Sequence, residues 1–284
     1  MHTKFPQRIE IEVSNSCNLC CTYCPRQYLN KPRGFIDRRL FEKIIDEASL
    51  YSETTLVLHR RGESLLHPDF INMCGYVKGK FADIQLATNA TLLDNSNSKA
   101  IIEALSFISF SIDVPQVFNK TRLHAEYIDV ERRIFNFLAL NKRKIKTQVS
   151  LVKTKDTGSD NIEIFKKKWA GKVDRVRIYE EHSINGVFGS LRRPRQRRNP
   201  CIMPDYELLV YYDGKVGRCN HDWNGEPMGD VRLQKISEIW CSDKYEKLRH
   251  QQAGLEITDE VCANCDSWYA EAGIQGTGEV IIHD

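Results

Sequence analysis

The sequence predicts an α/β protein, a curved and partial (β/α)6 barrel followed by a small α+β domain. Three observations favour this fold class. Short β-like runs and amphipathic helical runs alternate six times up to residue 179, which is typical of a parallel sheet with right-handed crossovers. After residue 200 the pattern changes to a hairpin and further helices. The cysteines fall mainly into two groups, one early and one late in the chain.

The elements of the barrel follow from the spacing of their apolar residues. In the first strand, Ile9, Ile11 and Val13 alternate with polar residues, as expected for a strand with two different faces. The six predicted strands cover 9–13, 55–59, 84–88, 107–112, 146–152 and 173–179. Helical spacing predicts helices over 40–48, 70–77, 99–105, 130–141 and 162–169.

Composition limits the class of protein. A chain of 284 residues, 41% of them hydrophobic, can build one large core or two modest ones. No apolar run is long enough to span a membrane, and the first residues lack the apolar core of a secretory signal, so we expect a cytoplasmic protein. Ten cysteines then indicate metal binding rather than disulfides. The net charge of +3 gives no reason to expect a nucleic-acid partner.

The first cysteine group is a C-x3-C-x2-C motif formed by Cys17, Cys21 and Cys24, directly after the first predicted strand. Three thiolates in one loop can bind three irons of a cubane cluster and leave the fourth iron without a protein ligand. An open metal position is what a catalytic site needs. The alternatives are buried thiols without a metal, or part of a zinc site.

This motif resembles that of the radical S-adenosylmethionine (radical SAM) superfamily. The resemblance implies that the open iron of a 4Fe–4S cluster chelates the amino and carboxyl groups of SAM. It also implies that an electron from the cluster cleaves SAM to a 5′-deoxyadenosyl radical, which abstracts a substrate hydrogen. The chemistry of such barrels lies at the C-terminal ends of the strands, where the motifs discussed next are expected.

Two further segments resemble the SAM-binding motifs of the family. The usual Gly-Gly-Glu-Pro appears as Arg61-Gly62-Glu63-Ser64, and the resemblance implies that Gly62 and Glu63 hold the methionine ammonium of SAM. Thr88-Asn89 is similar to the family's Thr-Asn-Gly, which contacts the ribose or carboxylate of SAM. The alternatives are a solvated loop for Glu63 and an Asx turn for Asn89.

Polar residues on the last strands of the barrel are candidate pocket liners. Ser111 lies in a Ser-x-Asp pattern with Asp113, which is also common in the family, and Asp113 could instead initiate a turn. Arg177 and Tyr179 share one face of the sixth strand. We predict that Ser111 helps to bind SAM.

The Arg192–Arg198 run marks the predicted domain boundary, because the stretch 191–200 holds five arginines and two prolines. Such a run is either a solvated linker or an arm that contacts phosphate groups. We place the partial TIM-like barrel at residues 1–190 and the second domain at residues 191–284.

The second cysteine group surrounds a predicted β-hairpin over 207–218, whose Asp213-Gly214 pair suits a tight primed turn. Cys201 precedes the hairpin, Cys219 ends it, and Cys262 and Cys265 follow later. Four thiolates in this arrangement can close either a zinc site or an iron–sulfur site.

Several short stretches of this region are similar to the SPASM/Twitch auxiliary-cluster domain. They are Pro200-Cys201, Asp213-Gly214-Lys215-Val216, Cys219-Asn220-His221-Asp222, Gly229-Asp230-Val231, Glu238-Ile239-Trp240, Leu248-Arg249 and Cys262-Ala263-Asn264-Cys265. The resemblance implies that Cys201, Cys219, Cys262 and Cys265 bind one auxiliary 4Fe–4S cluster.

Three cysteines remain outside these motifs. We predict that Cys74 is a core residue and that Cys20 is a structural neighbour of the first cluster. Cys241 follows Trp240 on a helix predicted over 236–250. It is either a thiol without a task or a catalytic hydrogen donor that faces the substrate pocket.

A radical SAM enzyme is preferred over an electron carrier, because Gly62-Glu63 and Thr88-Asn89 would have no purpose in the latter. The chain looks most like the compact Twitch dehydrogenases and epimerases of aminoglycoside biosynthesis. The resemblance implies oxidation of a carbinol carbon in a carbohydrate- or aminocyclitol-like small molecule, with the auxiliary cluster as electron acceptor.

Two alternative reactions stay open: epimerisation of a sugar carbon with Cys241 as hydrogen donor, and peptide modification. The first strand begins near residue 8 and leaves no room for an N-terminal peptide-recognition domain, which favours a small substrate. A phosphorylated or nucleotide-linked substrate would suit the arginine run. The family also implies an external electron donor such as flavodoxin or ferredoxin.

Overall fold

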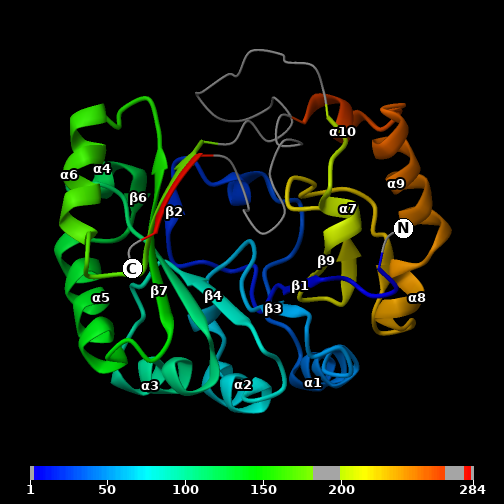
Figure 1. Ribbon diagram of the computed structural model, residues 1–284, viewed down its shortest axis with the longest axis horizontal. Coiled ribbons are helices and arrows are strands. Elements are labelled where there is room, and N and C mark those ends of the chain that lie inside the picture. Colours follow the sequence, from blue (N-terminus) through cyan, green and yellow to red (C-terminus); the bar gives the residue numbers. More distant parts are fainter. Residues whose placement is uncertain (1–2, 182–198, 266–277, 283–284) are drawn as a thin grey trace.

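The computed structural model describes residues 3–181, 199–265 and 278–282, which form one ten-stranded sheet, a separate two-stranded sheet and surrounding helices (Figure 1). The strand order of the large sheet is β11-β10-β9-β1-β3-β4-β5-β7-β8-β12. The six central strands from β1 to β8 are mutually parallel. This confirms the predicted fold class, a partial barrel of six parallel strands.

The barrel strands occupy the predicted positions with small shifts at their ends. They are β1 (Arg8–Ile11), β3 (Thr55–Val57), β4 (Ile84–Thr88), β5 (Phe107–Ser111), β7 (Lys146–Lys153) and β8 (Arg175–Glu180). The helices between them are α1 (Arg38–Ala48), α2 (Phe70–Val77), α3 (Asn95–Ala104), α4 (Pro115–Thr121), α5 (Tyr127–Asn141) and α6 (Ser159–Trp169). Of these, α4 was not expected from the sequence.

Local signals explain where several of these helices begin. The side chain of Asp37 accepts hydrogen bonds from the backbone amides of Arg39 and Leu40 and so caps α1. Asp94 and Asn97 form a reciprocal capping box at α3. Pro115 opens α4, where the missing amide hydrogen costs nothing.

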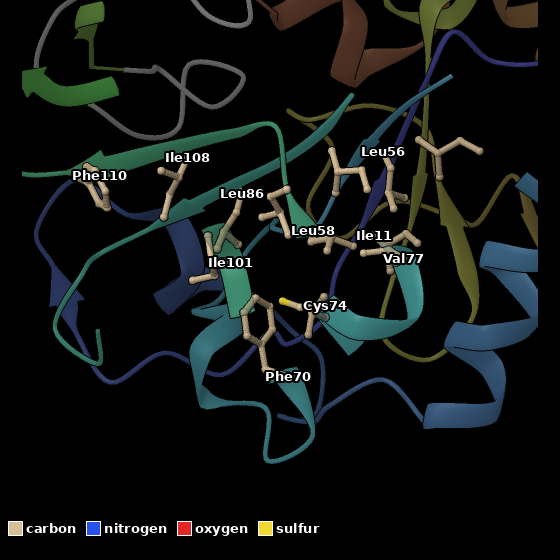
Figure 2. Packing of buried hydrophobic residues seen from close by; sticks show 14 of the residues in the cluster. Ile11, Leu56, Leu58, Phe70, Cys74, Val77, Leu86, Ile101, Ile108 and Phe110 are labelled. Carbon is tan, nitrogen blue, oxygen red and sulfur yellow. The ribbon is translucent and has the colours of Figure 1, made fainter. Parts of the chain in front are cut away.

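The two faces of the barrel sheet differ in polarity. One face carries apolar residues against the helices, and Figure 2 shows Ile11, Leu86 and Ile108 packed in one layer with Phe70 and Cys74 of α2. Cys74 is fully buried, which confirms its predicted place in the core. The other face carries many polar residues: Arg8, Glu10, Gln85, Ser109, Gln148, Ser150, Arg175 and Arg177. Val57, Ala87, Phe107 and Val152 are apolar residues on the same face. This inner face is where a polar ligand can bind.

The C-terminal region extends the same sheet. Its elements are α7 (Met203–Tyr206), β9 (Glu207–Val210), β10 (Lys215–Gly217), β11 (Gly229–Asp230), α8 (Ile236–Trp240), α9 (Asp243–Gly254), α10 (Glu260–Asn264) and β12 (Gly278–Ile282). The strand β9 pairs in parallel with β1, so the predicted hairpin lies beside the first barrel strand. At the opposite edge, β12 pairs antiparallel with β8.

Two local predictions in this region were wrong. Gly214 has a φ of 82°, but Asp213 does not have a positive φ, so the hairpin turn is not of the primed type. Instead the amide of Gly214 bonds to the carbonyl of Tyr211, and the left-handed glycine follows an ordinary turn. The helix expected over 236–250 is broken after Trp240, and Ser242 is the N-cap residue of α9.

The remaining short elements are β2 (Cys20–Cys21), β6 (Arg122–Leu123), η1 (Pro25–Tyr28) and η2 (Ser64–Leu66). Among the described residues, no helix is both long and apolar enough to cross a membrane.

Candidate active site

The cysteine loop follows β1 and is held to the barrel by backbone contacts. Cys20 and Cys21 of β2 pair antiparallel with β6, and the amide of Thr22 donates to the carbonyl of Thr121 over 2.8 Å. Cys17, Cys21 and Cys24 are partly exposed. The loop therefore presents its three thiols at the C-terminal end of β1, as predicted.

A buried charged network supports the loop from behind. The carboxylate of Asp113, which is 1% exposed, accepts hydrogen bonds from the Tyr23 hydroxyl at 2.8 Å and from Nε of Arg122 at 3.0 Å. Tyr23 lies between Cys21 and Cys24 in the chain, so Asp113 fixes the centre of the motif. Asp113 is an anchor of the loop, and its partner Arg122 was missed because nothing in the local sequence marks it.

The three thiols stay protonated without a bound metal. Burial raises the pKa of Cys17 and of Cys24 above the ordinary value, and it raises the pKa of Cys21 to about 11. The guanidinium of Arg122 opposes the rise at Cys21. Thiolates are the form that binds metal, so filling this site must release protons. Three thiols at this spacing in one loop, with no acidic or histidine side chain between them, fit three corners of an iron–sulfur cubane.

The predicted SAM-binding segment packs directly on the residues before the cysteine loop. A Cβ atom on Gly62 would lie 2.4 Å from the carbonyl oxygens of both Ser14 and Ser16, so only glycine fits there. The amide of Glu63 donates to the same Ser16 carbonyl over 2.8 Å. Gly62 therefore places Glu63 next to the cysteine loop.

Glu63 joins two of the predicted motifs. Its carboxylate accepts hydrogen bonds from the Thr88 hydroxyl at 2.9 Å and from the amide of Asn89 at 2.8 Å. Burial nevertheless raises its pKa above the usual value. The side-chain amide of Asn89 lies 3.7 Å from Sγ of Cys17. The solvated-loop alternative for Glu63 is therefore wrong, because its side chain is enclosed beside the cysteine loop.

Ser111 lies at the C-terminal end of β5, in register with Ser150 on β7. It is partly exposed and makes no side-chain hydrogen bond within the described part of the chain. The structure does not bring Ser111 into the network around Glu63, and its role as a SAM contact stays a prediction.

Arg61, where the sequence departs from the family pattern, and its neighbour Arg60 connect the barrel to the C-terminal region. Arg61 forms a two-point ion pair with Glu12, with Nε–Oε2 and Nη2–Oε1 distances of 2.5 and 2.9 Å, and both side chains are at most 1% exposed. It also donates to the carbonyl of Trp223 at 2.9 Å. Arg60 donates to the carbonyls of Asn220 and Cys219 at 2.9 and 3.3 Å. From the sequence, Arg61 was only a departure from the family motif, and Arg60 was given no role.

His59 lies at the C-terminal end of β3, directly before these arginines. Its Nδ1 accepts a hydrogen bond from the amide of Ala87 over 2.9 Å, so the ring proton of the neutral form is on Nε2. Burial lowers the pKa of His59 to about 4, although the carboxylate of Glu10 opposes this. His59 is therefore a neutral hydrogen-bond donor at physiological pH.

The four cysteines of the second group meet at one pocket. Cys201, Cys219, Cys262 and Cys265 line it together with apolar side chains that include Met203, Leu248 and Val261. Burial raises the pKa of Cys219, and the neighbouring Cys265 and Cys262 raise it further. The pocket thus collects the thiols of residues far apart in the chain.

The spacing of these groups does not suit one small ion. Within residues 3–181, 199–265 and 278–282, no three His, Cys, Asp or Glu side chains are close enough to hold a single metal ion. A zinc ion needs its ligands within about 2.3 Å, whereas a four-iron cluster binds each thiolate at a different corner. Four thiols around an apolar pocket fit the larger group.

Cys241 is not part of either group. It is exposed at the end of α8, and its sulfur lies 3.8 Å from the carbonyl of Lys4. Lys4 precedes β1, whereas the cysteine loop follows β1, so Cys241 lies at the opposite end of that strand. The catalytic role of Cys241 as a hydrogen donor stays a prediction. Cys20 is exposed beside Arg26, as a neighbour of the cysteine loop.

A cavity of about 600 Å³ opens beside the cysteine loop. It lies between Thr22, the α4 residues Gln116 and Lys120, and the β7–α6 connection at Thr154. None of the predicted SAM ligands lines it. The Arg192–Arg198 run lies outside the described residues.

Comparisons with known proteins gave a family model for the C-terminal region and relatives along most of the chain. Residues 201–266 match the SPASM family model, an iron–sulfur cluster-binding domain. The chain is 33% identical to the tungsten-containing aldehyde ferredoxin oxidoreductase cofactor-modifying protein of Pyrococcus furiosus, over 83% of this chain and 81% of that protein. It is 24% identical to the S-adenosyl-L-methionine-dependent 2-deoxy-scyllo-inosamine dehydrogenase of Niallia circulans, over 91% of this chain and 92% of that protein.

One solved structure extends the comparison to the fold. The crystal structure of BtrN in complex with AdoMet and 2-DOIA aligns with a TM-score of 0.66 at 18% identity and covers 94% of each chain. At this identity the likeness shows the fold alone.

Proposed function

Because the chain belongs to the radical SAM enzymes that carry a SPASM domain, we propose that it oxidises an alcohol carbon of a carbohydrate- or aminocyclitol-like small molecule. The enzyme uses 4Fe–4S clusters and SAM. In this proposal Cys17, Cys21 and Cys24 hold the SAM-binding cluster, and Cys201, Cys219, Cys262 and Cys265 hold the auxiliary one. Gly62, Glu63, Thr88, Asn89 and Ser111 face SAM.

The proposed reaction converts a carbinol to a ketone. The carbon loses a hydrogen atom, its hydroxyl loses a proton, and one electron leaves, so that C–OH becomes C=O. When bound, SAM and its cluster supply the radical that takes the hydrogen atom, and the auxiliary cluster supplies the acceptor for the electron. The residues of this chain hold the alcohol between the two sites and orient its oxygen.

The observation that carries the proposal is a pair of unmet hydrogen-bond donors after β3. Nε of Arg60 is buried without a hydrogen-bond partner, and Nε2 of His59 meets no acceptor within the described residues. Both side chains lie close to Glu10 on the inner face of the sheet. A buried donor without a partner, such as Nε of Arg60, is rare in native proteins, so this corner suits a ligand rich in oxygen atoms.

The similarity to the 2-deoxy-scyllo-inosamine dehydrogenase supports the choice of reaction, since that relative covers nearly the whole chain. Epimerisation with Cys241 as hydrogen donor is less well supported, because Cys241 is exposed at the other end of β1.

A second candidate function comes from the Pyrococcus relative, which is more similar in sequence. The substrate would then be the cofactor of another enzyme rather than a free aminocyclitol. The polar inner face would suit such a ligand too, so the two candidates differ in substrate and not in the residues that bind it.

The test is an anaerobic reaction of the reduced enzyme with SAM and 2-deoxy-scyllo-inosamine. The dehydrogenase proposal expects one 5′-deoxyadenosine for each ketone formed, and no deuterium from the solvent on the reacting carbon. Inverted product that carries one solvent deuteron would show the epimerase instead. Turnover of a tungsten cofactor, with none of the aminocyclitol, would favour the second candidate. We also expect reduced flavodoxin or ferredoxin to replace a chemical reductant.

A further inference from the structure

The segment from Arg60 to Glu63 contacts both cysteine sites. We propose that Arg60 and Arg61 are positioning residues that couple these sites, so that a filled auxiliary site tightens the binding of SAM. The proposal goes beyond the reaction proposed above, because it holds for any substrate. It depends only on the placement of the two cysteine groups and on the contacts between them.

On the auxiliary side, the two arginines hold the backbone around Cys219. Arg60 donates to the carbonyl of Cys219 itself and to that of Asn220, and its Nη1 also contacts Oδ1 of Asn220. Arg61 donates to the carbonyl of Trp223, and its guanidinium lies 3.8 Å from the ring centre of Tyr211. Three carbonyls of the loop that carries one predicted cluster ligand are thus bound by two side chains.

On the SAM side, the same segment has no freedom to shift. Gly62 is wedged between the carbonyls of Ser14 and Ser16, immediately before Cys17. Glu63 bonds to Ser16 through its amide and to Asn89 through its carboxylate. A displacement of Arg61 would therefore also displace Gly62 and Glu63, which are the next two residues of the chain.

The buried charges explain why the link is stiff. Arg61 and Glu12 are both almost completely buried, and separating a buried ion pair is strongly unfavourable. The side chain of Arg61 must therefore stay paired with Glu12 even when the carbonyl of Trp223, to which it also donates, changes position. Without an auxiliary cluster that binds all four thiols, the loop around Cys219 is no longer held through its cysteine. The carbonyl groups to which the two arginines donate then lose their fixed positions. SAM binding and auxiliary-site filling are then linked, and the linkage is reciprocal.

The first test compares the affinity for SAM with and without the auxiliary cluster. SAM is titrated into the reduced wild type and into Cys262→Ala/Cys265→Ala, and binding is followed by the EPR signal of the remaining cluster. We expect the dissociation constant to rise at least about fivefold in the variant, the lower end of typical coupling. Equal dissociation constants would overturn the proposal.

The second test removes the link and keeps both cysteine groups. In Glu12→Leu/Arg61→Met the buried ion pair is replaced by apolar side chains of similar volume, a change that proteins often tolerate. In this background, the loss of Cys262 and Cys265 should change the affinity for SAM by less than about twofold, against the typical coupling of fivefold or more. The dissociation constant for SAM without the auxiliary cluster, divided by that with the cluster, gives a ratio for each background. A ratio as large as in the wild type would contradict the role of Arg61.

Arg249 offers a matched control on the auxiliary side. It is also buried, donates to a backbone carbonyl, that of Pro204, at 3.0 Å, and lies 4.4 Å from the ring centre of Trp240. It does not touch the segment from Arg60 to Glu63. Arg249→Met should therefore leave the coupling ratio at its wild-type value, and loss of coupling there would show that any weakening of this region has the same effect.

Hydrogen–deuterium exchange tests the proposal if the Glu12→Leu/Arg61→Met protein does not fold. In the otherwise wild-type chain, removal of the auxiliary cluster should speed exchange of the Glu63 amide, which bonds to Ser16. The amides of β5 serve as an internal reference and should not change. Unchanged exchange at Glu63 would overturn the link.

Discussion

The three predicted cluster ligands after β1 lie within residues 17–24, whereas the four cysteines that line the auxiliary pocket are spread over residues 201–265. The first group is contained in one loop that is fixed by a buried ion pair, Asp113 with Arg122. The second group comes from the segment before α7, the end of β10 and the helix α10, and it meets around apolar side chains. Both sites bring cysteine thiols together, but they are assembled in different ways.

This difference shows what each site needs from the rest of the chain. The loop is largely built by local sequence, so its three thiols are placed as soon as the barrel forms. The pocket depends on the hairpin pairing with β1 and on the packing of α9 and α10. The two arginines after β3 join a site defined by local sequence to one defined by tertiary contacts.

Removal of thiols from each site should give the largest effects. The reconstituted wild type should hold roughly eight irons per chain, from two four-iron clusters. Cys17→Ala/Cys21→Ala/Cys24→Ala and Cys262→Ala/Cys265→Ala should each lose about half of this iron, as measured by elemental analysis. Zinc in place of iron in the first variant, or a full iron load in either, would contradict the assignment.

The same contrast explains how much could be predicted from sequence. The six strands and the motifs at their ends were found because alternation and spacing are local properties. The auxiliary quartet was found through family resemblance, since no local spacing joins Cys201 to Cys262. The partners Asp113–Arg122, Glu12–Arg61 and Arg60–Cys219 were missed, because each joins residues from different elements. The break after Trp240 had a local signal, Ser242 followed by Asp243 and Glu246, which is typical of a helix start.

Asp113→Asn should lower the free energy of unfolding by about 3–5 kcal/mol, because it leaves Arg122 buried without its counter-charge. Urea denaturation of the reconstituted protein measures this. The paired change Asp113→Leu/Arg122→Met should cost much less. On the auxiliary side, Asp259→Asn breaks the more exposed pair with Arg218 and should cost about 1 kcal/mol or less. Equal losses of unfolding free energy in Asp113→Asn and Asp259→Asn would contradict the inferred difference between the two sites.

Glu63→Gln should weaken SAM binding about ten- to a hundredfold, because a hydrogen bond to a charged group is worth about 1.5–3 kcal/mol. The amide keeps the size of the side chain, so iron content should not change. A SAM titration followed by EPR gives the affinity. An unchanged affinity would remove Glu63 from the SAM site and leave it as a support for Asn89.

His59 should make the barrel less stable in acid. Its pKa is about 4 in the folded protein, below the ordinary value of 6.5, so between these values the unfolded chain binds a proton that the folded chain does not. Stability is therefore lost as the pH falls from 6.5 toward 4, by roughly 1–3 kcal/mol. His59→Gln should flatten this part of the stability–pH profile, whereas the same change at the exposed His250 should not. Equal profiles for all three proteins would contradict the burial of His59 as a neutral donor.

Release of 5′-deoxyadenosine by the two cysteine variants tests most directly whether the sites have different roles. Each reduced protein is incubated without oxygen at saturating SAM, and the nucleoside is quantified by chromatography. The wild type and Cys262→Ala/Cys265→Ala should both form it, and Cys17→Ala/Cys21→Ala/Cys24→Ala should form none. Formation of 5′-deoxyadenosine by the triple variant, or its absence from the double variant at saturating SAM, would show that the loop after β1 is not the site of SAM cleavage on its own.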